Sequence, residues 1–347
     1  MKYTRIVVAH YGGPEELRAV EAECPEPRRG EVRVKVLTAG VALPDVLMRE
    51  GVHPETPRLP FTPGWDLVGV VDQVGDDVTG IERGQTVAAL PVFGAYSEFI
   101  CLRQRLLVPV PAGLNPVEAV SLVLNYGTAY QMLHRSVRTS PGRRVLIHGA
   151  SGGVGTALLQ LGRLEGLEMY GTCSSRGAAA VKGLGGIPID YQTADFVDEI
   201  HRLTGDGVDV VFDGLGGANI WRSRNALRPG GRVIAYGLTS MLHGGRLASG
   251  GAGRRHRFRG VAGYAYYIAG SWLLPGRRRV KTYSIQWLMR LRPAVFREDM
   301  IALFNLLQQK KIQPLIAGTF SLAQARRAHE MLGQGGVTGK IVLVCHP

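Results

Sequence analysis

Cysteine is scarce in this sequence. The 347 residues contain four cysteines, Cys24, Cys101, Cys173 and Cys345, which lie far apart. No two of them have the spacing of zinc ligands or of a redox pair. A disulfide framework is typical of short, cysteine-dense chains. We therefore expect free, buried thiols in a protein of a reducing compartment.

The sequence also lacks a long apolar run. Its first residues, MKYTRIVVAH, do not contain the apolar core of a signal peptide. The apolar segment at 260–275 is shorter than the roughly 20 residues that a membrane-spanning helix needs. These features predict a cytoplasmic protein that is at most peripheral to a membrane.

Acidic residues are in the minority. There are 28 Asp and Glu against 41 Lys and Arg, which gives a net charge of +13. The excess lies mainly in 254–259 and 277–281, and no nucleic-acid-binding motif accompanies it, so we expect no nucleic acid partner. Attraction to anionic cofactors, acidic partners or membrane surfaces explains the charge equally well.

The order of predicted elements indicates two kinds of domain. The chain is long enough for about two domains. Short β-rich segments at 31–40, 67–75 and 85–102 predict a twisted antiparallel sheet or barrel. From about residue 122, strands alternate with helices, which predicts an α/β domain with a parallel sheet covered on both faces. Strands are expected at 145–150, 167–173, 187–191, 208–216 and 232–237, and helices at 125–137, 154–166, 178–185, 196–205 and 222–229. The chain should close with a helix at 299–312 and then a turn, a helix and a strand.

A glycine-rich turn, VLIHGASGGVG, stands between the first of these strands and its helix. Its glycines permit a tight turn and a close approach to a pyrophosphate, whose charge would lie at the helix N-terminus. Because the strand–turn–helix–strand context is present, the motif predicts a dinucleotide site.

The second strand ends in Ser174-Ser175-Arg176 and carries no acid there. An NAD-preferring site usually places Asp or Glu at this point to bind the ribose hydroxyls. A carboxylate would repel a 2′-phosphate, whereas serine hydroxyls and the planar guanidinium bind it well. The segment therefore favours NADPH, with Lys182 as a weaker second contact.

Several motifs occur together in the order of one known family. They are TAGVALPDVLMREG, LPFTPGWDLVGVVDQVG, GAYSEFICL, NYGTAYQML, VLIHGASGGVG, IPIDY and GGVTGKIVLV. With them the chain resembles the medium-chain dehydrogenase/reductase superfamily, in its zinc-free quinone oxidoreductase branch, with some similarity to vesicle amine transport protein-like members. The resemblance implies a GroES-like β-barrel catalytic domain at 1–122, a Rossmann NADP-binding domain at 123–238, a basic and aromatic insertion at 239–293, and a return to the catalytic domain at 294–347.

The zinc ligands of the family's alcohol dehydrogenases are missing. Those enzymes carry a cysteine near Ala42 and a His-Glu pair after Pro-Gly, where this sequence has Trp65-Asp66. Without a Lewis acid, the accessible chemistry is hydride delivery to an electron-poor carbon. We expect a zinc-independent, NADPH-dependent reductase of quinones or α,β-unsaturated carbonyl compounds. Two alternatives stay open: an enoyl-thioester reductase acting on an acyl carrier, and a membrane-associated nucleotide-binding protein with little turnover.

The resemblance also assigns site residues. Ala42 and Leu47 replace the Asn and Tyr usual in quinone oxidoreductases, which suggests a more apolar substrate. The candidate catalytic residues are Tyr130, Asp45 and Tyr126, although Asp45 could instead pair with Arg49. The candidate cofactor-binding residues are Thr128, Ser151, Gly152, Gly153, Val154, Ser174, Ser175, Arg176, Tyr191, Leu215, Gly216, Tyr236, Gly237, Leu238 and Lys340.

The insertion at 239–293 places aromatic and apolar residues between arginine clusters. Such a segment suits a lid over the substrate, a contact between subunits, or an interfacial contact with anionic lipid. We expect a small-molecule electron-poor substrate and a homodimer, and we expect 260–275 to contribute little to the Rossmann core.

Overall fold

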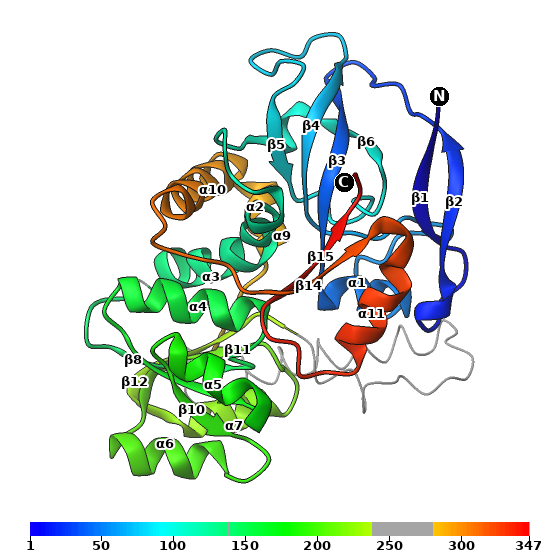
Figure 1. The fold of residues 1–347 in the computed structure, drawn as a ribbon. Helices are drawn as coiled ribbons and strands as arrows, with labels where there is room; N and C mark the ends of the chain where they lie inside the picture. Colours follow the sequence, from blue (N-terminus) through cyan, green and yellow to red (C-terminus); the bar gives the residue numbers. More distant parts are fainter. Residues whose placement is uncertain (138, 238–279, 347) are drawn as a thin grey trace.

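Two sheets organise the protein in the computed structural model, which describes residues 1–137, 139–237 and 280–346. Within that part of the chain, one sheet has the strand order β14-β15-β3-β4-β5-β7, with β6 paired to β3. The other has the order β10-β9-β8-β11-β12-β13. Figure 1 shows them as separate bodies, with helices between them and around the second sheet.

The first sheet is built from the N-terminal third. Its strand β3 shows why: Val32, Val34 and Val36 alternate with half-exposed polar residues and are fully buried, the period of a strand with one face in a core. The expected antiparallel sheet is thus confirmed. The elements of this part of the chain are β1 (Lys2–Val8), η1 (Pro14–Glu16), β2 (Leu17–Glu23), β3 (Glu31–Val41), α1 (Leu43–Arg49), β4 (Leu67–Val74), β5 (Thr86–Ala89), β6 (Phe99–Arg103), η2 (Gln104–Leu106) and β7 (Val108–Pro109). Strands β1 and β2 pair with each other in a separate two-stranded sheet.

The second sheet is parallel throughout its described strands. The order is that of a doubly wound sheet, 3-2-1-4-5-6, and it confirms the α/β prediction. Every residue of its central strand β11 is buried, as expected when helices cover both faces. The strands are β8 (Arg144–His148), β9 (Glu168–Cys173), β10 (Ile187–Asp190), β11 (Val208–Asp213), β12 (Leu227–Ala235) and β13 (Val280–Thr282).

Helical segments precede and separate these strands. The stretch that leads into the second sheet consists of α2 (Pro116–Ser121), the π-helical η3 (Leu122–Tyr126), α3 (Gly127–Gln131) and the π-helical η4 (Met132–Val137). The crossover helices are α4 (Gly153–Leu164), α5 (Ser175–Gly183), α6 (Phe196–Thr204) and α7 (Asn219–Asn225). Each of α4 to α7 follows a strand, so the helix N-termini gather at the carboxyl edge of the sheet, where ligands bind in such folds.

The C-terminal segment returns to the first sheet. Strand β15 pairs antiparallel with β3, with Ile341 opposite Val41, and Figure 1 shows it running beside β3 in red. The segment comprises α9 (Ile285–Leu291), α10 (Pro293–Gln308), β14 (Ile316–Ser321), η8 (Leu322–Gln324), α11 (Ala325–Gly333) and β15 (Lys340–Val344). The chain thus crosses between the two bodies twice.

Four expected elements differ clearly from the structure. The helix expected at 299–312 is α10, which begins at Pro293 and ends at Gln308. The expected turn at 316–321 is strand β14, because it pairs in parallel with β15. The helix expected at 222–229 ends at Asn225, because Leu227 already pairs with Val208 of β11. The helix expected from 178 begins at Ser175, so that the Ser-Ser-Arg segment caps a helix.

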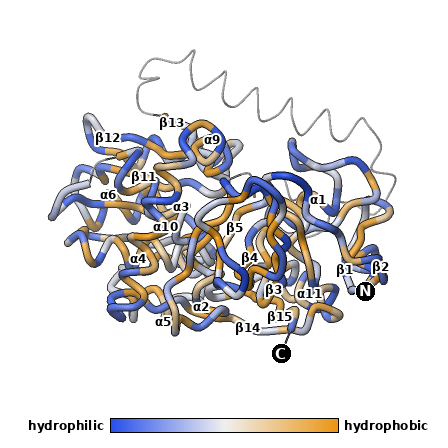
Figure 2. Tube along the Cα trace, turned by 90° about the horizontal axis from the view of Figure 1, so that it is seen from above, coloured by the Kyte–Doolittle hydropathy of each residue, from blue (hydrophilic) through white to orange (hydrophobic). Residues whose placement is uncertain are grey.

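Hydrophobic residues concentrate inside the two bodies. Figure 2 shows hydrophobic stretches along β3, β4 and β15, with hydrophilic loops around them. In the described part of the chain, no helix combines the length and the apolarity that crossing a bilayer requires. The expectations for Leu238 and for most of the 239–293 insertion, including 260–275, fall outside the described residues.

Candidate active site

The glycine-rich turn joins β8 to α4 at the carboxyl edge of the parallel sheet. Gly149 has φ 65°, a conformation that glycine adopts at no steric cost. A Cβ on Gly155 would lie 2.6 Å from the carbonyl oxygen of Ala150, so only glycine lets helix and turn approach this closely. Gly152 caps α4 without a side-chain hydrogen bond. The first amides of this twelve-residue helix are therefore available to an anion.

Asn125, which the sequence did not single out, lies against this turn. A Cβ on Gly153 would overlap its side-chain amide. Asn125 is 6% exposed and comes from η3, so the glycine makes room for a polar group from the helical stretch before β8. Asn125 belongs to the segment NYGTAY, which lies within one of the family motifs of the sequence. Only the packing of η3 against α4 shows that this residue lies at the glycine turn.

The Ser-Ser-Arg segment lies next to the same turn. Ser174 is the N-cap of α5, and its hydroxyl makes no capping bond. A Cβ on Gly177 would lie 2.6 Å from Oγ of Ser151, so α5 packs directly on the glycine turn. Arg176 is exposed and forms no ion pair with any described residue. Lys182 is also exposed, but it lies in the last turn of α5, about 10 Å along the helix from Ser175.

The C-terminal loop reaches the turn from the other body. The backbone N–H of Gly339 donates to the carbonyl oxygen of Ser151 at 3.0 Å, and Gly339 forms a parallel bridge with Gly152. Ser151 therefore contacts α5 on one side and the C-terminal loop on the other. The structure brings together the expected residues Ser151, Gly152, Gly153, Ser174, Ser175 and Arg176.

A chain of buried, hydrogen-bonded side chains lies beneath the glycine-rich turn. Gly149 N–H donates to Oγ1 of Thr172 at 3.3 Å, and Thr172 lies 3.0 Å from Nδ1 of His148. Nε2 of His148 is 3.0 Å from Oγ of Ser223, whose hydroxyl donates to Asp213 at 2.8 Å. Because Ser223 uses its proton on Asp213, it accepts from the Nε2–H of His148, and Thr172 donates to Nδ1. Burial lowers the pKa of His148, in agreement with a neutral ring.

Asp213 extends this chain to the loop after β11. Its Oδ1 accepts the backbone N–H groups of Leu215 and Gly216, both at 2.9 Å. Oδ2 also accepts from the side-chain amide of Asn219 at 3.0 Å. The same network therefore holds the glycine turn at one end and two expected cofactor contacts at the other.

The loops after β10 and β12 complete the carboxyl edge. Tyr236 N–H donates to the Asp213 carbonyl oxygen at 3.0 Å. A Cβ on Gly214 would lie 2.9 Å from the Tyr236 hydroxyl. Burial, and then the charge of Asp213, raise the pKa of Tyr236. Tyr191 follows β10 and is 59% exposed, which leaves its ring free to pack on a ligand.

Thr128 is held by a residue that the sequence did not identify. Tyr283, directly after β13, donates its hydroxyl to Oε1 of Gln131 at 2.7 Å. Burial raises the pKa of Tyr283, while a hydrogen bond with Thr128 acts against this rise. Tyr283 falls within the predicted insertion, where no motif marked it. Tyr283 is recognised as a residue of the candidate site only from its position at the carboxyl end of the parallel strand β13.

Lys340 does not point at the glycine turn. Its ammonium lies 2.9 Å from Oδ2 of Asp66, and Lys340 and Asp66 are 3% and 0% exposed. A Cβ on Gly40 would overlap both side chains, so Gly40 provides the space for this pair. Lys340, a candidate cofactor contact, thus has its ammonium engaged by Asp66, whereas its neighbour Gly339 touches the turn.

Asp45 has a structural position. It is fully buried, and its two carboxylate oxygens accept the N–H groups of Ala42 at 2.9 Å and Gly64 at 3.0 Å. Burial, reinforced by the charge of Asp66, raises its pKa to about 7. Arg49 pairs with Glu50 at 2.7 Å instead of with Asp45. The expected Asp45–Arg49 bridge is wrong, and Asp45 is too enclosed to touch a substrate.

The two candidate tyrosines lie in different surroundings. The Tyr126 hydroxyl is buried and finds no hydrogen-bond partner among the described residues, and burial raises its pKa. Tyr130 stacks on His134 with ring centroids 4.2 Å apart. His134 lies 3.8 Å from Glu165, at the end of α4 opposite the glycine turn. The structure therefore encloses the Tyr126 hydroxyl without a partner among the described residues and places Tyr130 away from the turn.

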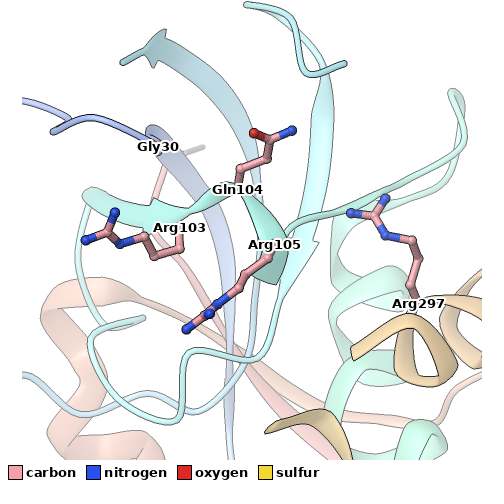
Figure 3. Close-up of a pocket in the computed structure, with 5 residues that line it drawn as sticks. All are labelled: Gly30, Arg103, Gln104, Arg105 and Arg297. Carbon is pink, nitrogen blue, oxygen red and sulfur yellow. The ribbon is translucent and has the colours of Figure 1, made fainter. Parts of the chain in front are cut away.

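A separate hollow of about 600 Å³ is lined by Gly30, Arg103, Gln104, Arg105 and Arg297. Figure 3 shows its three guanidinium groups pointing in different directions. Arg103 and Arg297 already donate to backbone carbonyl oxygens, of Arg29 at 3.0 Å and of Leu107 at 2.7 Å. None of the residues expected from the sequence lines this hollow, and its arginines do not converge on one point.

The residues at the family's zinc position do not suit a metal. Trp65 is 3% exposed, and its indole N–H has no acceptor among the described residues. Asp66 is engaged by Lys340. Across residues 1–137, 139–237 and 280–346, no group of three or more His, Cys, Asp or Glu side chains is placed to hold a metal ion. This donor set does not fit an open tetrahedral zinc site.

Two family models match the chain. The alcohol dehydrogenase GroES-like domain covers residues 28–112, which contain most of the first sheet. The model described as zinc-binding dehydrogenase covers residues 186–343, from β10 to β15.

Known proteins match over nearly the whole chain. The synaptic vesicle membrane protein VAT-1 homolog of Danio rerio is 32% identical over 352 residues, covering 99% of this chain and 70% of the relative. The quinone oxidoreductase of Mus musculus is 30% identical over 351 residues, covering 98% and 97%. The crystal structure of Escherichia coli quinone oxidoreductase complexed with NADPH superimposes with a TM-score of 0.84 at 26% identity, covering 99% and 100%.

Proposed function

Because the chain belongs to the medium-chain dehydrogenase/reductase superfamily, we propose that it is a zinc-independent, NADPH-dependent reductase of quinones or α,β-unsaturated carbonyl compounds. Its quinone oxidoreductase relatives support an oxidoreductase. The observation that carries the proposal is the position of Arg176. Its exposed guanidinium, without a carboxylate partner in the described chain, stands at the N-terminus of α5 beside the glycine turn.

The cofactor would lie along the carboxyl edge of the parallel sheet. The amides at the start of α4 would bind the pyrophosphate. Arg176, with the free hydroxyls of Ser174 and Ser175, would bind the 2′-phosphate. Tyr191 would pack on the adenosine. When bound, NADPH supplies a hydride to the substrate.

On the substrate side, the residues that stand at the family's zinc-ligand and polar-lining positions support the proposal. Leu47 and Trp65 are both buried, and their apolar side chains would suit an apolar substrate. Tyr126 is the proposed hydrogen-bond donor to the substrate oxygen. The raised pKa keeps its hydroxyl protonated, and this hydroxyl has no other partner among the described residues.

The test is turnover with a defined panel. Purified, chelator-treated protein is given NADPH or NADH with quinones, enones and enoyl thioesters, and cofactor oxidation is followed at 340 nm. We expect turnover of at least one quinone or enone, with NADPH preferred, and a loss of turnover in Tyr126→Phe larger than in Tyr130→Phe. Turnover restricted to enoyl thioesters would favour the acyl-carrier alternative. Absence of turnover with every compound would contradict the proposal.

A second candidate function is association with anionic membranes. The observation that favours it is the similarity to relatives named as synaptic vesicle membrane proteins. Sedimentation with vesicles containing phosphatidylserine, at low and high salt, tests it, because attraction between basic residues and lipid is screened over about 8–10 Å. Binding that is equal with neutral vesicles would contradict this candidate.

We also propose a cytoplasmic homodimer. Strand β13 supports it, because in the described chain this three-residue strand pairs only with β12 and leaves its other edge open to another chain. Light scattering coupled to size exclusion measures the mass directly. A mass of one chain at micromolar concentration would contradict the dimer.

A further inference from the structure

The loop between α11 and β15, residues 334–339, is anchored at both ends. Gln334 N–H donates to the Glu330 carbonyl oxygen at 3.0 Å, which continues α11 into the loop. At the other end, Gly339 N–H donates to Ser151 of the glycine turn, and Lys340 N–H donates to the carbonyl oxygen of Leu315 at 2.8 Å. These backbone hydrogen bonds, together with the packing of Val337 on the hydrophobic core, hold the middle of the loop beside the proposed cofactor site.

Gly336, in the middle of this loop, lies against the end of the Arg176 side chain. A Cβ on Gly336 would lie 2.7 Å from Cζ, 2.7 Å from Nη2 and 3.1 Å from Nε of Arg176. Three guanidinium atoms of Arg176 thus lie against the backbone of Gly336, in the space that a side chain on this residue would occupy. Both residues are exposed, so a ligand phosphate has access to the guanidinium from the solvent side.

We propose that Gly336 is a specificity-determining residue. Because it has no side chain, its backbone contacts the guanidinium of Arg176 and keeps it in position to bind the 2′-phosphate of NADPH. This inference rests on the proposed function and deepens it. An arginine loses much conformational entropy when it is fixed, and a side chain ordered before binding loses less on binding. The C-terminal loop, from the other end of the chain, then completes the phosphate site at α5.

The chain contains a matched control for this contact. Gly335 and Gly336 have nearly the same positive φ, 72° and 71°, so an alanine strains the backbone similarly at either position. A Cβ on Gly335 meets nothing within 4 Å, whereas a Cβ on Gly336 meets Arg176. The atoms displaced by Gly336→Ala belong to the tip of a flexible side chain, so the two variants should be equally stable.

The experiment measures the dissociation constants of NADPH and NADH for the wild type, Gly335→Ala, Gly336→Ala and Arg176→Ala. Asn tolerates positive φ better than other residues with a side chain. The pair Gly335→Asn and Gly336→Asn therefore replaces the alanine pair if that pair does not fold. We expect Gly336→Ala to reduce the preference for NADPH about three- to tenfold, the effect of ordering one long side chain. Gly335→Ala should leave the preference unchanged.

The double variant Gly336→Ala/Arg176→Ala separates the contact from other effects. If Gly336 acts through Arg176, the double variant should show the same cofactor preference as Arg176→Ala alone. Equal effects of Gly335→Ala and Gly336→Ala, or additive effects in the double variant, would overturn this inference. If instead Arg176→Ala itself leaves NADPH binding unchanged, the proposed 2′-phosphate site fails and the inference fails with it.

Discussion

The ammonium of Lys340 lies 2.9 Å from Oδ2 and 3.3 Å from Oδ1 of Asp66, inside the protein. The pair joins β15, near the end of the chain, to the loop that leads into β4. It stands in the segment where zinc-dependent members of the family have His-Glu. A buried charge of this kind is tolerated only with its partner present, and Gly40 provides the space for both groups.

Lys340→Met should therefore destabilise the protein strongly. The substitution leaves the Asp66 carboxylate buried without its counter-charge, which costs about 3–5 kcal/mol of unfolding free energy. Urea unfolding of wild type and variant measures the difference. Lys311→Met is the control, since Lys311 is exposed and forms no ion pair with a described residue. Equal stability of the two variants would contradict the importance of the pair.

Arg176→Ala should weaken NADPH binding about tenfold or more, because it removes a charge-assisted contact with the 2′-phosphate. NADH lacks this phosphate, so its affinity should stay unchanged. Fluorescence titration with each cofactor provides both constants. Lys182→Ala serves as the comparison, because Lys182 lies in the last turn of α5. A wild type that binds both cofactors equally would refute the assignment.

Ser223→Ala should affect stability and cofactor binding together. It removes an acceptor from His148 and a donor from Asp213, both buried, which costs about 1–3 kcal/mol. Because this hydrogen-bond network holds the glycine turn and the 215–216 loop in place, NADPH affinity should also fall. Calorimetric titration and urea unfolding measure the two effects. Ser140→Ala, at an exposed position, should change neither. Loss of stability with unaltered NADPH affinity would show that the network supports the fold alone.

His329 should make the protein acid-sensitive. Burial, and then the charge of Arg49, lower the pKa of His329 to about 3. Arg49 donates to its Nδ1 at 3.2 Å, which requires the neutral ring. Between pH 6.5 and about 3 the unfolded chain binds a proton at this residue and the folded chain does not, so stability falls as pH falls through this window.

From pH 7 to pH 5, His329 alone should lower the unfolding free energy by about 2 kcal/mol. His329→Gln keeps one donor and one acceptor but does not titrate. Urea unfolding at both pH values should therefore show a smaller loss in the variant than in the wild type. Parallel pH dependences in the two proteins would contradict the lowered pKa.

The structural features that the sequence predicted are those that depend on local residue patterns. The β-rich segment at 31–40 predicted β3, and the glycine turn between a strand and a helix predicted the dinucleotide site at Ser151 and Gly152. The end of α7 was missed because tertiary pairing decides it: Leu227 pairs with Val208 of β11, followed by a register shift that no local pattern predicts.

Local sequence patterns could not predict the contacts between segments that lie far apart in the chain. Lys340 pairs with Asp66, 274 residues away in the chain. Gly336 meets Arg176, and Tyr283 meets Gln131. Each contact depends on how the C-terminal segment returns between the two sheets, and no propensity or spacing encodes that path. Asp45 was misassigned for the same reason, since its burial follows from the packing of α1 under the Gly64 loop.

The central claim is hydride transfer from NADPH to an electron-poor carbon without zinc. The most direct test uses NADPH deuterated at both C4 positions of the nicotinamide and an enone that the protein turns over, with protein whose zinc content is measured before and after treatment with a chelator. The account predicts far less than one zinc per chain before chelation, turnover that the chelator leaves unchanged, and deuterium on the β-carbon of the reduced enone. Stoichiometric zinc whose removal abolishes turnover, or a reduced product without deuterium, would contradict it.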